Sequence, residues 1–347
     1  MKLIEASLYT RSDTEVECHV CFRRCKIRPG SLGFCRVRKN MKGRLYSLNY
    51  GKLIAENLDP IEKKPLFHFY PGSTAYSVAT VGCNYKCSFC CNWNISQSAE
   101  IAGMERTPEQ VVEEAVSAKA TSISYTYTEP TINIEFVAKT AKLAHERGIK
   151  NTVVTNGSMT PEALDFVHPY LDAATVDFKG NGNKEFYLKK MGVPSMDHIY
   201  ETLTGMKKKG IHVEVTDLIV PKYGESVRDL VNLVHWIVNE LGRETPFHLL
   251  RFFPSYLMLD VPATPLRLVE EGLEVARREG LEYAYAGNVP GHRTESTYCP
   301  KCGELLISRH GFFVDSVKLT DSNSCPKCGR SIPIVGTPTA SPVSVLY

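Results

Sequence analysis

The twelve cysteines of this chain fall into three groups of four, at residues 18–35, 83–91 and 299–328. Thiols at such short spacings favour metal ligation over disulfides in a reducing compartment, so each group predicts a metal site. The chain opens without the apolar stretch of a signal peptide and has no apolar run long enough to span a membrane. We therefore expect a cytoplasmic protein with metal-bound cysteines.

The central group contains Cys83, Cys87 and Cys90 at C-x3-C-x2-C spacing, directly after a predicted strand. Three thiolates leave one iron of a [4Fe–4S] cluster without a protein ligand, and S-adenosylmethionine can chelate that iron. One electron from the reduced cluster would then break a carbon–sulfur bond, and the 5′-deoxyadenosyl radical would abstract hydrogen from a substrate. A zinc site or unrelated thiols are the alternative. Cys91 would close the open iron, so we interpret it as a neighbour of the site.

The carboxyl-terminal group consists of two C-P-K-C-G knuckles, Cys299/Cys302 and Cys325/Cys328. Each supplies two thiolates on a tight turn, and together they predict a zinc ribbon with a tetrahedral site. A rubredoxin-like iron accepts the same geometry and remains the alternative. Residues 311–318 are predicted to form a strand of the ribbon hairpin.

The amino-terminal group is less regular, with ligands at Cys18, Cys21, Cys25 and Cys35. Four thiolates suit zinc, which we favour slightly, or an additional iron–sulfur cluster, in a structural or an electron-relay role. In both flanking groups the metal would stabilise a segment too small to fold by hydrophobic burial alone.

Strands and helices alternate through the middle of the chain. Predicted strands lie at residues 73–80, 122–127, 151–155, 174–178, 213–220, 248–253 and 283–286, and helices begin at Thr107-Pro108 and Thr160-Pro161 and span 132–148, 196–209, 226–241 and 265–279. Such alternation predicts an α/β fold, a partial or full (β/α) barrel with reactive groups at the carboxyl ends of its strands. We divide the chain into a Cys-rich module (1–72), the barrel (73–294), a ribbon-like module (295–336) and a tail (337–347).

The central motif, with Phe89 before its third cysteine, resembles the radical S-adenosylmethionine (radical SAM) superfamily. The resemblance implies that side chains at the strand ends bind the cofactor: Phe89, Cys91, Glu129, Asn156, Asp177, Lys179 and Tyr256. Glu129 lies in Tyr-Thr-Glu-Pro, where relatives have Gly-Gly-Glu and receive the cofactor's amino group. Tyr256 stands where activating enzymes have a histidine. Taken alone, Glu129 could be a helix-terminal charge, and Asp177 and Lys179 a simple ion pair.

Over nearly its whole length the chain is similar to the radical SAM enzyme of the AmmeMemoRadiSam system, and in its middle third to pyruvate formate-lyase activating enzymes. The matching residues are 18–38, 59–72, 83–97, 125–131, 177–180 and 287–292. The resemblance implies an oxidoreductase of the activating-enzyme type with a bound [4Fe–4S] cluster, but no particular substrate. In segment 59–72, Lys63, Lys64 and His68 predict a clamp between module and barrel, or a contact for substrate or electron donor.

We expect an enzyme that uses the adenosyl radical on a small molecule or on a residue of a partner protein. If that residue is a glycine, the chain is a glycyl-radical enzyme activase, although the extra cysteines do not follow the cluster loop as they do in activases. The expected electron donor is a protein such as a ferredoxin or flavodoxin. A non-catalytic zinc-ribbon binding protein is the rival, but the net charge of only +3 argues against nucleic acid, and no membrane contact is expected.

Overall fold

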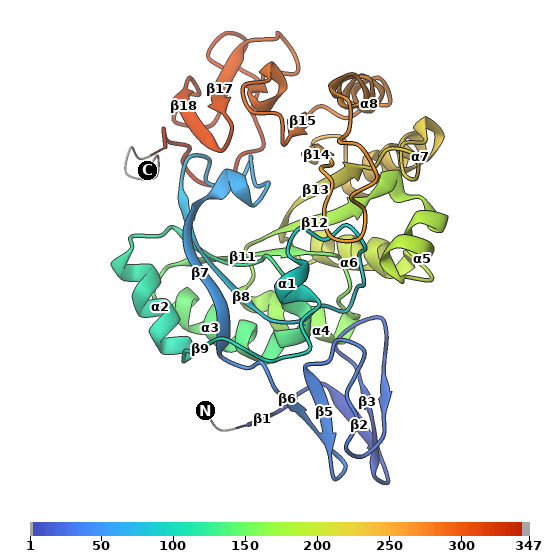
Figure 1. Ribbon diagram of the computed structural model, residues 1–347. Helices are drawn as coiled ribbons and strands as arrows, with labels where there is room; N and C mark the ends of the chain where they lie inside the picture. Colours follow the sequence, from blue (N-terminus) through green and yellow to red (C-terminus); the bar gives the residue numbers. More distant parts are fainter. Residues whose placement is uncertain (1–2, 342–347) are drawn as a thin grey trace.

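The computed structural model describes residues 3–341, and a nine-stranded sheet lies at its centre. Most of the sheet is parallel, in the order β15-β14-β13-β12-β11-β10-β8, followed by β7 and β9. The parallel strands are β8 (Thr74–Thr80), β10 (Ser122–Tyr125), β11 (Lys150–Thr155), β12 (Ala173–Lys179), β13 (His212–Ile219), β14 (Phe247–Arg251) and β15 (Ala284–Gly287). Since the order begins at β15 and ends at β9, the α/β fold is an open, partial barrel (Figure 1).

Helices cover the outer face of this sheet (Figure 1). They are α2 (Pro108–Ser117), α3 (Ile134–Glu146), α4 (Pro161–Val167), α5 (Lys184–Met191), α6 (Asp197–Lys208), α7 (Val227–Trp236) and α8 (Leu266–Arg278). Every predicted strand of the barrel is confirmed, with ends that differ by at most two residues. The predicted capping box at Thr107 is also present, because its side chain accepts from Gln110 N while the Gln110 side chain accepts from Thr107 N.

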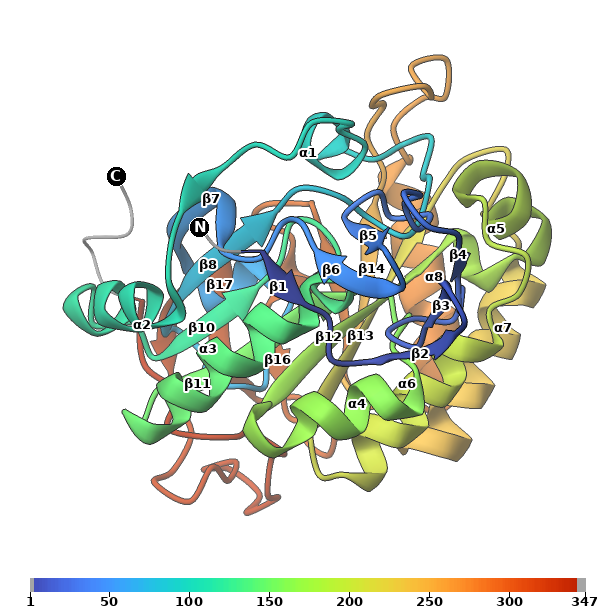
Figure 2. The same ribbon diagram turned by 90° about the horizontal axis from the view of Figure 1, so that it is seen from below.

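Strand β7 (Lys52–Pro60) runs antiparallel to β8 and carries the short edge strand β9 (Met104–Glu105). The segment after it, residues 61–72, crosses the amino-terminal ends of the parallel strands, where Thr175 Oγ1 donates to Lys64 O. Figure 2 shows β7 beside β8 from below. Residues 52–72 were assigned to the amino-terminal module from sequence, but in the structure they extend the sheet and form the barrel floor.

Small modules lie at opposite ends of the barrel (Figure 1). The amino-terminal module has two sheets, β2 (Tyr9–Ser12), β3 (Glu15–Cys18) and β4 (Lys26–Ile27), and β1 (Ile4–Glu5), β6 (Arg44–Ser47) and β5 (Arg38–Met41). The carboxyl-terminal module is one sheet of β16 (Thr297–Tyr298), β17 (Leu305–His310) and β18 (Phe313–Val317). Its hairpin turn is at Gly311, with φ of 60°, so the predicted strand 311–318 is shorter and its partner precedes it.

The predicted tail is partly ordered onto the barrel and the ribbon. Thr339 N donates to Pro71 O, and Ser341 N to Val314 O, both at 2.9 Å. Residues 342–347 of the predicted tail lie outside the described residues.

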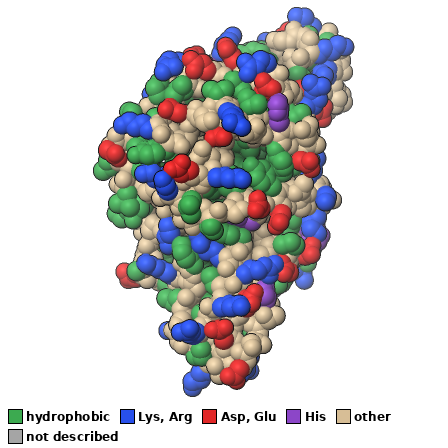
Figure 3. Space-filling model, turned by 90° about the vertical axis from the view of Figure 1, so that its right-hand side faces the viewer, with side chains coloured by type: hydrophobic (Ala, Val, Ile, Leu, Met, Phe, Trp, Pro, Cys, Tyr) green, Lys and Arg blue, Asp and Glu red, His purple; other side chains and the backbone are tan. Residues whose placement is uncertain are grey.

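Within the described part of the chain, helices are too short or too polar to cross a membrane. On the face beside α5 and α7, acidic and basic side chains are interspersed around a hollowed hydrophobic centre (Figure 3).

Candidate functional site

The cysteine loop leaves the carboxyl end of β8 through Gly82. This glycine has φ of 100°, and a Cβ added there would lie 2.8 Å from Val37 Cγ1, so the turn requires a glycine. Burial raises the pKa of Cys83 well above its usual range, and that of Cys87 to about 12. The charges of neighbouring cysteines add to both shifts, since Cys87 acts on Cys83 and Cys90 acts on Cys87. Three thiols thus share one small volume, and a metal is needed to hold them as thiolates at neutral pH.

Backbone hydrogen bonds fix this loop to two neighbouring segments. Lys86 N donates to Met191 O at 2.9 Å and Ser88 N to Lys190 O at 2.8 Å, at the end of α5. Leu257 N, in the loop after β14, donates to Ser88 O at 2.8 Å. These hydrogen bonds hold the cysteine loop against α5 and the loop after β14, as a site that must orient a reactive group requires.

Three predicted cofactor residues lie on or against this loop. The Phe89 ring is buried against Phe186, with ring centroids 5.3 Å apart, so it anchors the loop in the core. Cys91 is exposed. Tyr256 stacks on Trp93 at 5.0 Å and has φ of 52°. Both Tyr256 and Cys91 lie at the mouth of the barrel, and the contacts predicted for them with a cofactor stay predictions.

Glu129 is buried at the end of β10 and joins two strand ends. Its carboxylate accepts from Thr131 N at 3.0 Å, Thr155 Oγ1 at 2.8 Å and Asn156 N at 2.8 Å. Burial raises its pKa, and these donors oppose the shift. Tyr127, two residues earlier, has φ of 63°, so a tyrosine adopts the left-handed conformation here, which non-glycine residues rarely do.

Asn156 contacts Cys83 and Asn84 of the cysteine loop through its side chain. Its Nδ2 is 2.9 Å from Asn84 Oδ1 and 3.9 Å from Cys83 Sγ. Its Oδ1 is buried and has no hydrogen-bond partner among the described residues. Buried acceptors are rarely left unpaired, so this atom fits a bound molecule that donates a hydrogen bond beside Cys83.

Asp177 and Lys179 point into the barrel from β12 and form an ion pair, with Lys179 Nζ 3.0 Å from Asp177 Oδ2. Thr216 Oγ1 donates to Asp177 Oδ1 at 2.5 Å. Burial opposes the charge of Lys179, but Asp177, followed by Cys87 and Cys91, raises its pKa above the ordinary value. Lys179 thus presents a positive charge to the cysteine loop, where bound thiolates would concentrate negative charge.

A buried polar cluster beneath the loop was missed by sequence reasoning. Tyr127 Oη donates to Asp59 Oδ2, which also accepts from Lys64 Nζ at 2.6 Å. Burial lowers the pKa of Lys64 to about 8, and Asp59 opposes this shift. Lys64 was singled out from sequence, but Tyr127 was noted only as a replacement for glycine. The contact joins residues far apart in the chain, so spacing alone could not have shown it.

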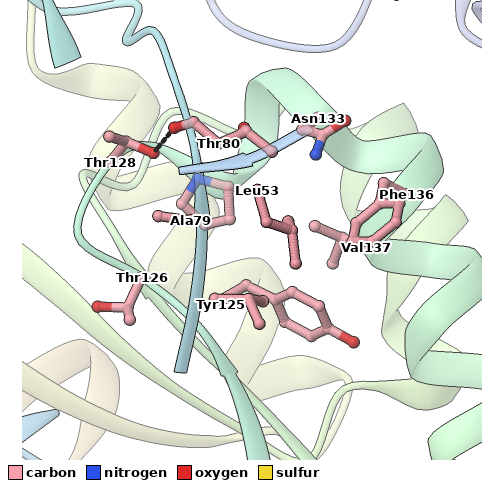
Figure 4. Close-up of a pocket in the computed structure, with 11 residues that line it drawn as sticks. Leu53, Ala79, Thr80, Tyr125, Thr126, Thr128, Asn133, Phe136 and Val137 are labelled. Carbon is pink, nitrogen blue, oxygen red and sulfur yellow. Dashed lines mark hydrogen bonds between the residues drawn. The ribbon is translucent and has the colours of Figure 1, made fainter. Parts of the chain in front are cut away.

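A small cavity nearby is part of the core. It lies between β7, β8, β10 and α3, with Leu53, Tyr125 and Val137 in its wall and Thr128 Oγ1 donating to Thr80 O at 2.7 Å (Figure 4). Its lining contains none of the residues predicted to bind metal or cofactor. It carries no chemistry of its own, although Thr128 supports the turn that leads to Glu129.

The four carboxyl-terminal cysteines form a compact site. All four sulfurs lie within 4.8 Å of one another, with Cys299 Sγ 3.5 Å from Cys328 Sγ and Cys302 Sγ 3.6 Å from Cys325 Sγ. A tetrahedral ion with metal–sulfur bonds of about 2.3 Å needs sulfurs at this separation. The residues fit one zinc or iron ion, and the site lies at the barrel end opposite the central cysteine loop (Figure 1).

The amino-terminal cysteines also meet, but less tightly. Cys18, Cys21, Cys25 and Cys35 line one cavity. Within residues 3–341, only the carboxyl-terminal four bring three or more sulfurs within 4.8 Å of one another. The carboxyl-terminal set is therefore compact, the amino-terminal set shares one cavity, and the central set lies on one loop after β8. Their metals stay predictions.

An open (β/α) barrel with a three-cysteine loop after its first parallel strand defines a class of cofactor-dependent enzymes. Residues 77–237 match the family model of the radical SAM superfamily. An uncharacterized protein of Methanocaldococcus jannaschii is 47% identical over 318 residues, 91% of this chain and 94% of its own length. The chain belongs to the radical SAM superfamily.

More distant relatives are also similar to this chain. A Methanocaldococcus jannaschii protein that carries the provisional name of a glycyl-radical enzyme activating enzyme is 27% identical over 172 residues, 48% of this chain and 70% of its own. Streptococcus suis SuiB bound to S-adenosylmethionine is 16% identical with a TM-score of 0.49, covering 66% of this chain and 53% of SuiB.

Proposed function

We propose that this enzyme reductively cleaves S-adenosylmethionine at a [4Fe–4S] cluster held by Cys83, Cys87 and Cys90, and uses the 5′-deoxyadenosyl radical to abstract hydrogen from a substrate. The observation that carries the proposal is the fixed loop of three thiols at the carboxyl end of β8. When bound, the cluster supplies one electron, which splits the cofactor into methionine and the radical. The radical would then take a hydrogen atom from the substrate and leave as 5′-deoxyadenosine.

The chain's own residues would bind and orient the cofactor. The unpaired Asn156 Oδ1 is positioned to accept a hydrogen bond beside Cys83, and Glu129 holds the Asn156 backbone in place. Lys179 places a positive charge near Cys87, which offsets the negative charge of bound thiolates. The Phe89 ring fills the wall behind the loop and keeps water from it.

A reduced protein such as a ferredoxin or flavodoxin supplies the electron in this proposal, in the cytoplasm. Positive side chains gather next to the loop: Lys86 interacts with Arg36 and Arg23 and with the charge of Cys83. Acidic electron carriers would be attracted to such a surface. Interspersed charges on the face in Figure 3 lack the basic stripe of a nucleic-acid binder.

A glycyl radical in a partner protein is the second candidate product, favoured by the relative with the activating-enzyme name. Large apolar side chains at the barrel mouth are consistent with a macromolecular substrate. Phe253, Leu257 and Leu259 are 50%, 68% and 71% exposed in the loop that carries Tyr256. Exposed apolar side chains at this density are typical of contact surfaces.

The test is anaerobic reconstitution followed by addition of S-adenosylmethionine and dithionite, with 5′-deoxyadenosine quantified. We expect product from the wild type and from Ser88→Ala, and none from Cys87→Ala, because Cys87 is a cluster ligand and Ser88 only bonds to Lys190 O through its side chain. A wild type that carries zinc alone at these cysteines, or an intact reducible cluster that yields no product, would contradict the proposal.

A further inference from the structure

We infer that Cys18, Cys21, Cys25 and Cys35 hold a second, polynuclear iron–sulfur cluster, which passes electrons to the cluster at Cys83, Cys87 and Cys90. The first half concerns the amino-terminal site alone. The second half rests on the proposed function. We thus infer an iron–sulfur cluster where the sequence slightly favoured zinc. The reasons are the spacing of the four cysteines, the burial of their cavity, and the position of the site beside the central cysteine loop.

The spacing of the cysteines differs between the amino-terminal and the carboxyl-terminal site. A single tetrahedral ion needs all four thiolate sulfurs within about 4 Å of one another, because its bonds are about 2.3 Å. The carboxyl-terminal cysteines meet this requirement, whereas in the described chain neither the amino-terminal four nor the central three do. A polynuclear cluster distributes its ligands over several irons and so spreads them further apart. Like the central site, the amino-terminal site lacks the compact spacing of the carboxyl-terminal one in the described residues.

Enclosure suits an iron–sulfur cluster. Cys18, Cys21 and Cys35 are buried, and apolar Val20, Ile27 and Ile132 line the same cavity. A dry apolar shell protects such a cluster and tunes its potential.

Buried positive charge faces the four thiols. Arg38 is 2% exposed and pairs with Glu135 at 2.6 Å, while its charge acts on Cys18 and Cys35. Four thiolates carry net negative charge even when they hold iron, so a nearby guanidinium stabilises the loaded site. Glu135 holds Arg38 in place through both of its carboxylate oxygens.

The amino-terminal site lies next to the central cysteine loop. Asn84, the residue after Cys83, contacts both. The Asn84 side chain lines the amino-terminal cavity and donates to Ser158 Oγ at 2.8 Å. Asn156 bonds to Asn84 Oδ1 and to Cys83 Sγ, so one amide contacts both residues. Phe22 N donates to Ser158 O at 3.0 Å and holds the two sites against each other.

Arg23 lies between the two sets of cysteines. Its Nε donates to Asn84 O at 2.6 Å and its Nη2 to Gly192 O at 2.7 Å. Its charge interacts with Cys21 and Cys25 on one side and with Cys83 on the other. Arg23 and Asn84 thus each contact both sites. The two clusters would therefore lie close to each other.

The redox step requires an external one-electron donor, a reduced ferredoxin or flavodoxin. The amino-terminal cluster gains one electron from the donor, is reduced, and returns to its oxidised state when it passes that electron to the barrel cluster. No bond forms or breaks at the amino-terminal cluster, and the electron leaves it for the cofactor cleavage already described.

Metal analysis of the full chain tests the first half. In a variant with Cys83, Cys87 and Cys90 all changed to alanine, we expect iron and acid-labile sulfide to remain, and the sulfide to disappear when Cys21→Ala and Cys35→Ala are added, because a single ion at the carboxyl-terminal cysteines holds no sulfide. Zinc without sulfide in the triple variant would overturn the inference. Should a variant fail to fold, the wild type alone decides: spectra of the reduced protein must show two clusters, and one cluster would refute it.

The electron donor tests the second half. Product formation is measured with reduced flavodoxin and with dithionite, which can reduce the barrel cluster directly. In Cys21→Ala/Cys35→Ala, the ratio of flavodoxin-driven to dithionite-driven rates is expected to fall at least tenfold, whereas a structural role would lower both equally. If the triple variant keeps iron but the wild type makes no 5′-deoxyadenosine, only the proposed function fails. If the triple variant keeps no iron or sulfide but the wild type makes 5′-deoxyadenosine, only the inference fails.

Discussion

Asp217 shows how burial tunes a single residue next to the site. It lies on β13 and accepts from Asn181 N through Oδ1 at 3.1 Å, while Oδ2 has no hydrogen-bond partner among the described residues. Burial raises its pKa to about 7, and the charge of Lys179 opposes that shift. The carboxyl group is therefore partly protonated at neutral pH, on the strand next to the one that carries the Asp177–Lys179 ion pair.

The change Asp217→Asn should stabilise the protein at high pH. The folded-state pKa lies above the unfolded value of about 3.9, so the stability that the bound proton contributes is lost as pH rises from about 4 to about 7. Asparagine mimics the protonated acid and has no proton to lose. Urea unfolding should show a gain about 2.6 kcal/mol larger at pH 8 than at pH 5, since the two pH values differ by about two units of titration at about 1.4 kcal/mol each.

Asp260→Asn, at an exposed position, is the matched control. The account of Asp217 fails if both variants respond to pH in the same way. At this scale, local strand order predicted the strand ends that carry Glu129, Asn156 and Asp177, while the cofactor and metal roles of these residues and of the cysteines stay predictions. Sequence did not predict the roles of Asn84, Arg23 and Tyr127, because these roles depend on partners elsewhere in the chain.

At the scale of elements, local signals predicted the barrel well. A capping box at Thr107 and a glycine with positive φ at Gly148 mark the start of one helix and the end of the next. Helix α5 was missed because its segment KEFYLKKM has no clear apolar stripe, although Asn183 caps it and Gly192 ends it with φ of 65°. Strand β7 was missed because it is defined by antiparallel pairing with β8, which no local pattern reveals.

The floor of the barrel depends on Glu214 of β13, a fully buried carboxylate. It accepts from Phe67 N at 3.0 Å, His68 N at 2.7 Å and His248 Nε2 at 2.7 Å. Glu214→Gln keeps the shape but removes a charge and one acceptor oxygen, leaving a buried donor unpaired. We expect a loss of about 3 kcal/mol in the free energy of unfolding, measured in urea.

The exposed pair between Glu162 and Arg24 supplies the control. Glu162→Gln should change stability by less than about 1 kcal/mol, because exposed ion pairs contribute little. Equal effects of the two substitutions would mean that Glu214 does not hold segment 61–72 on the barrel.

At the scale of the whole molecule, the two small modules have different relations to the chemistry. The amino-terminal module docks at the cysteine loop, as the bond from Arg23 Nε to Asn84 O shows, whereas the ribbon docks on the floor through Arg309 Nη2, which donates to Phe67 O at 2.8 Å. Sequence predicted both modules but not the end at which each lies. Those positions depend on contacts between segments that are distant in the sequence, and the spacing of residues in the sequence does not reveal such contacts.

The central claim is that S-adenosylmethionine binds the open iron of a cluster held by Cys83, Cys87 and Cys90. Electron–nuclear double resonance on the reduced protein, with the cofactor labelled at its amino nitrogen and carboxylate oxygen, tests this directly. The account predicts couplings from both labels in the wild type and none when the three cysteines are alanine. A fully reduced wild-type cluster that shows no coupling to either label would contradict it.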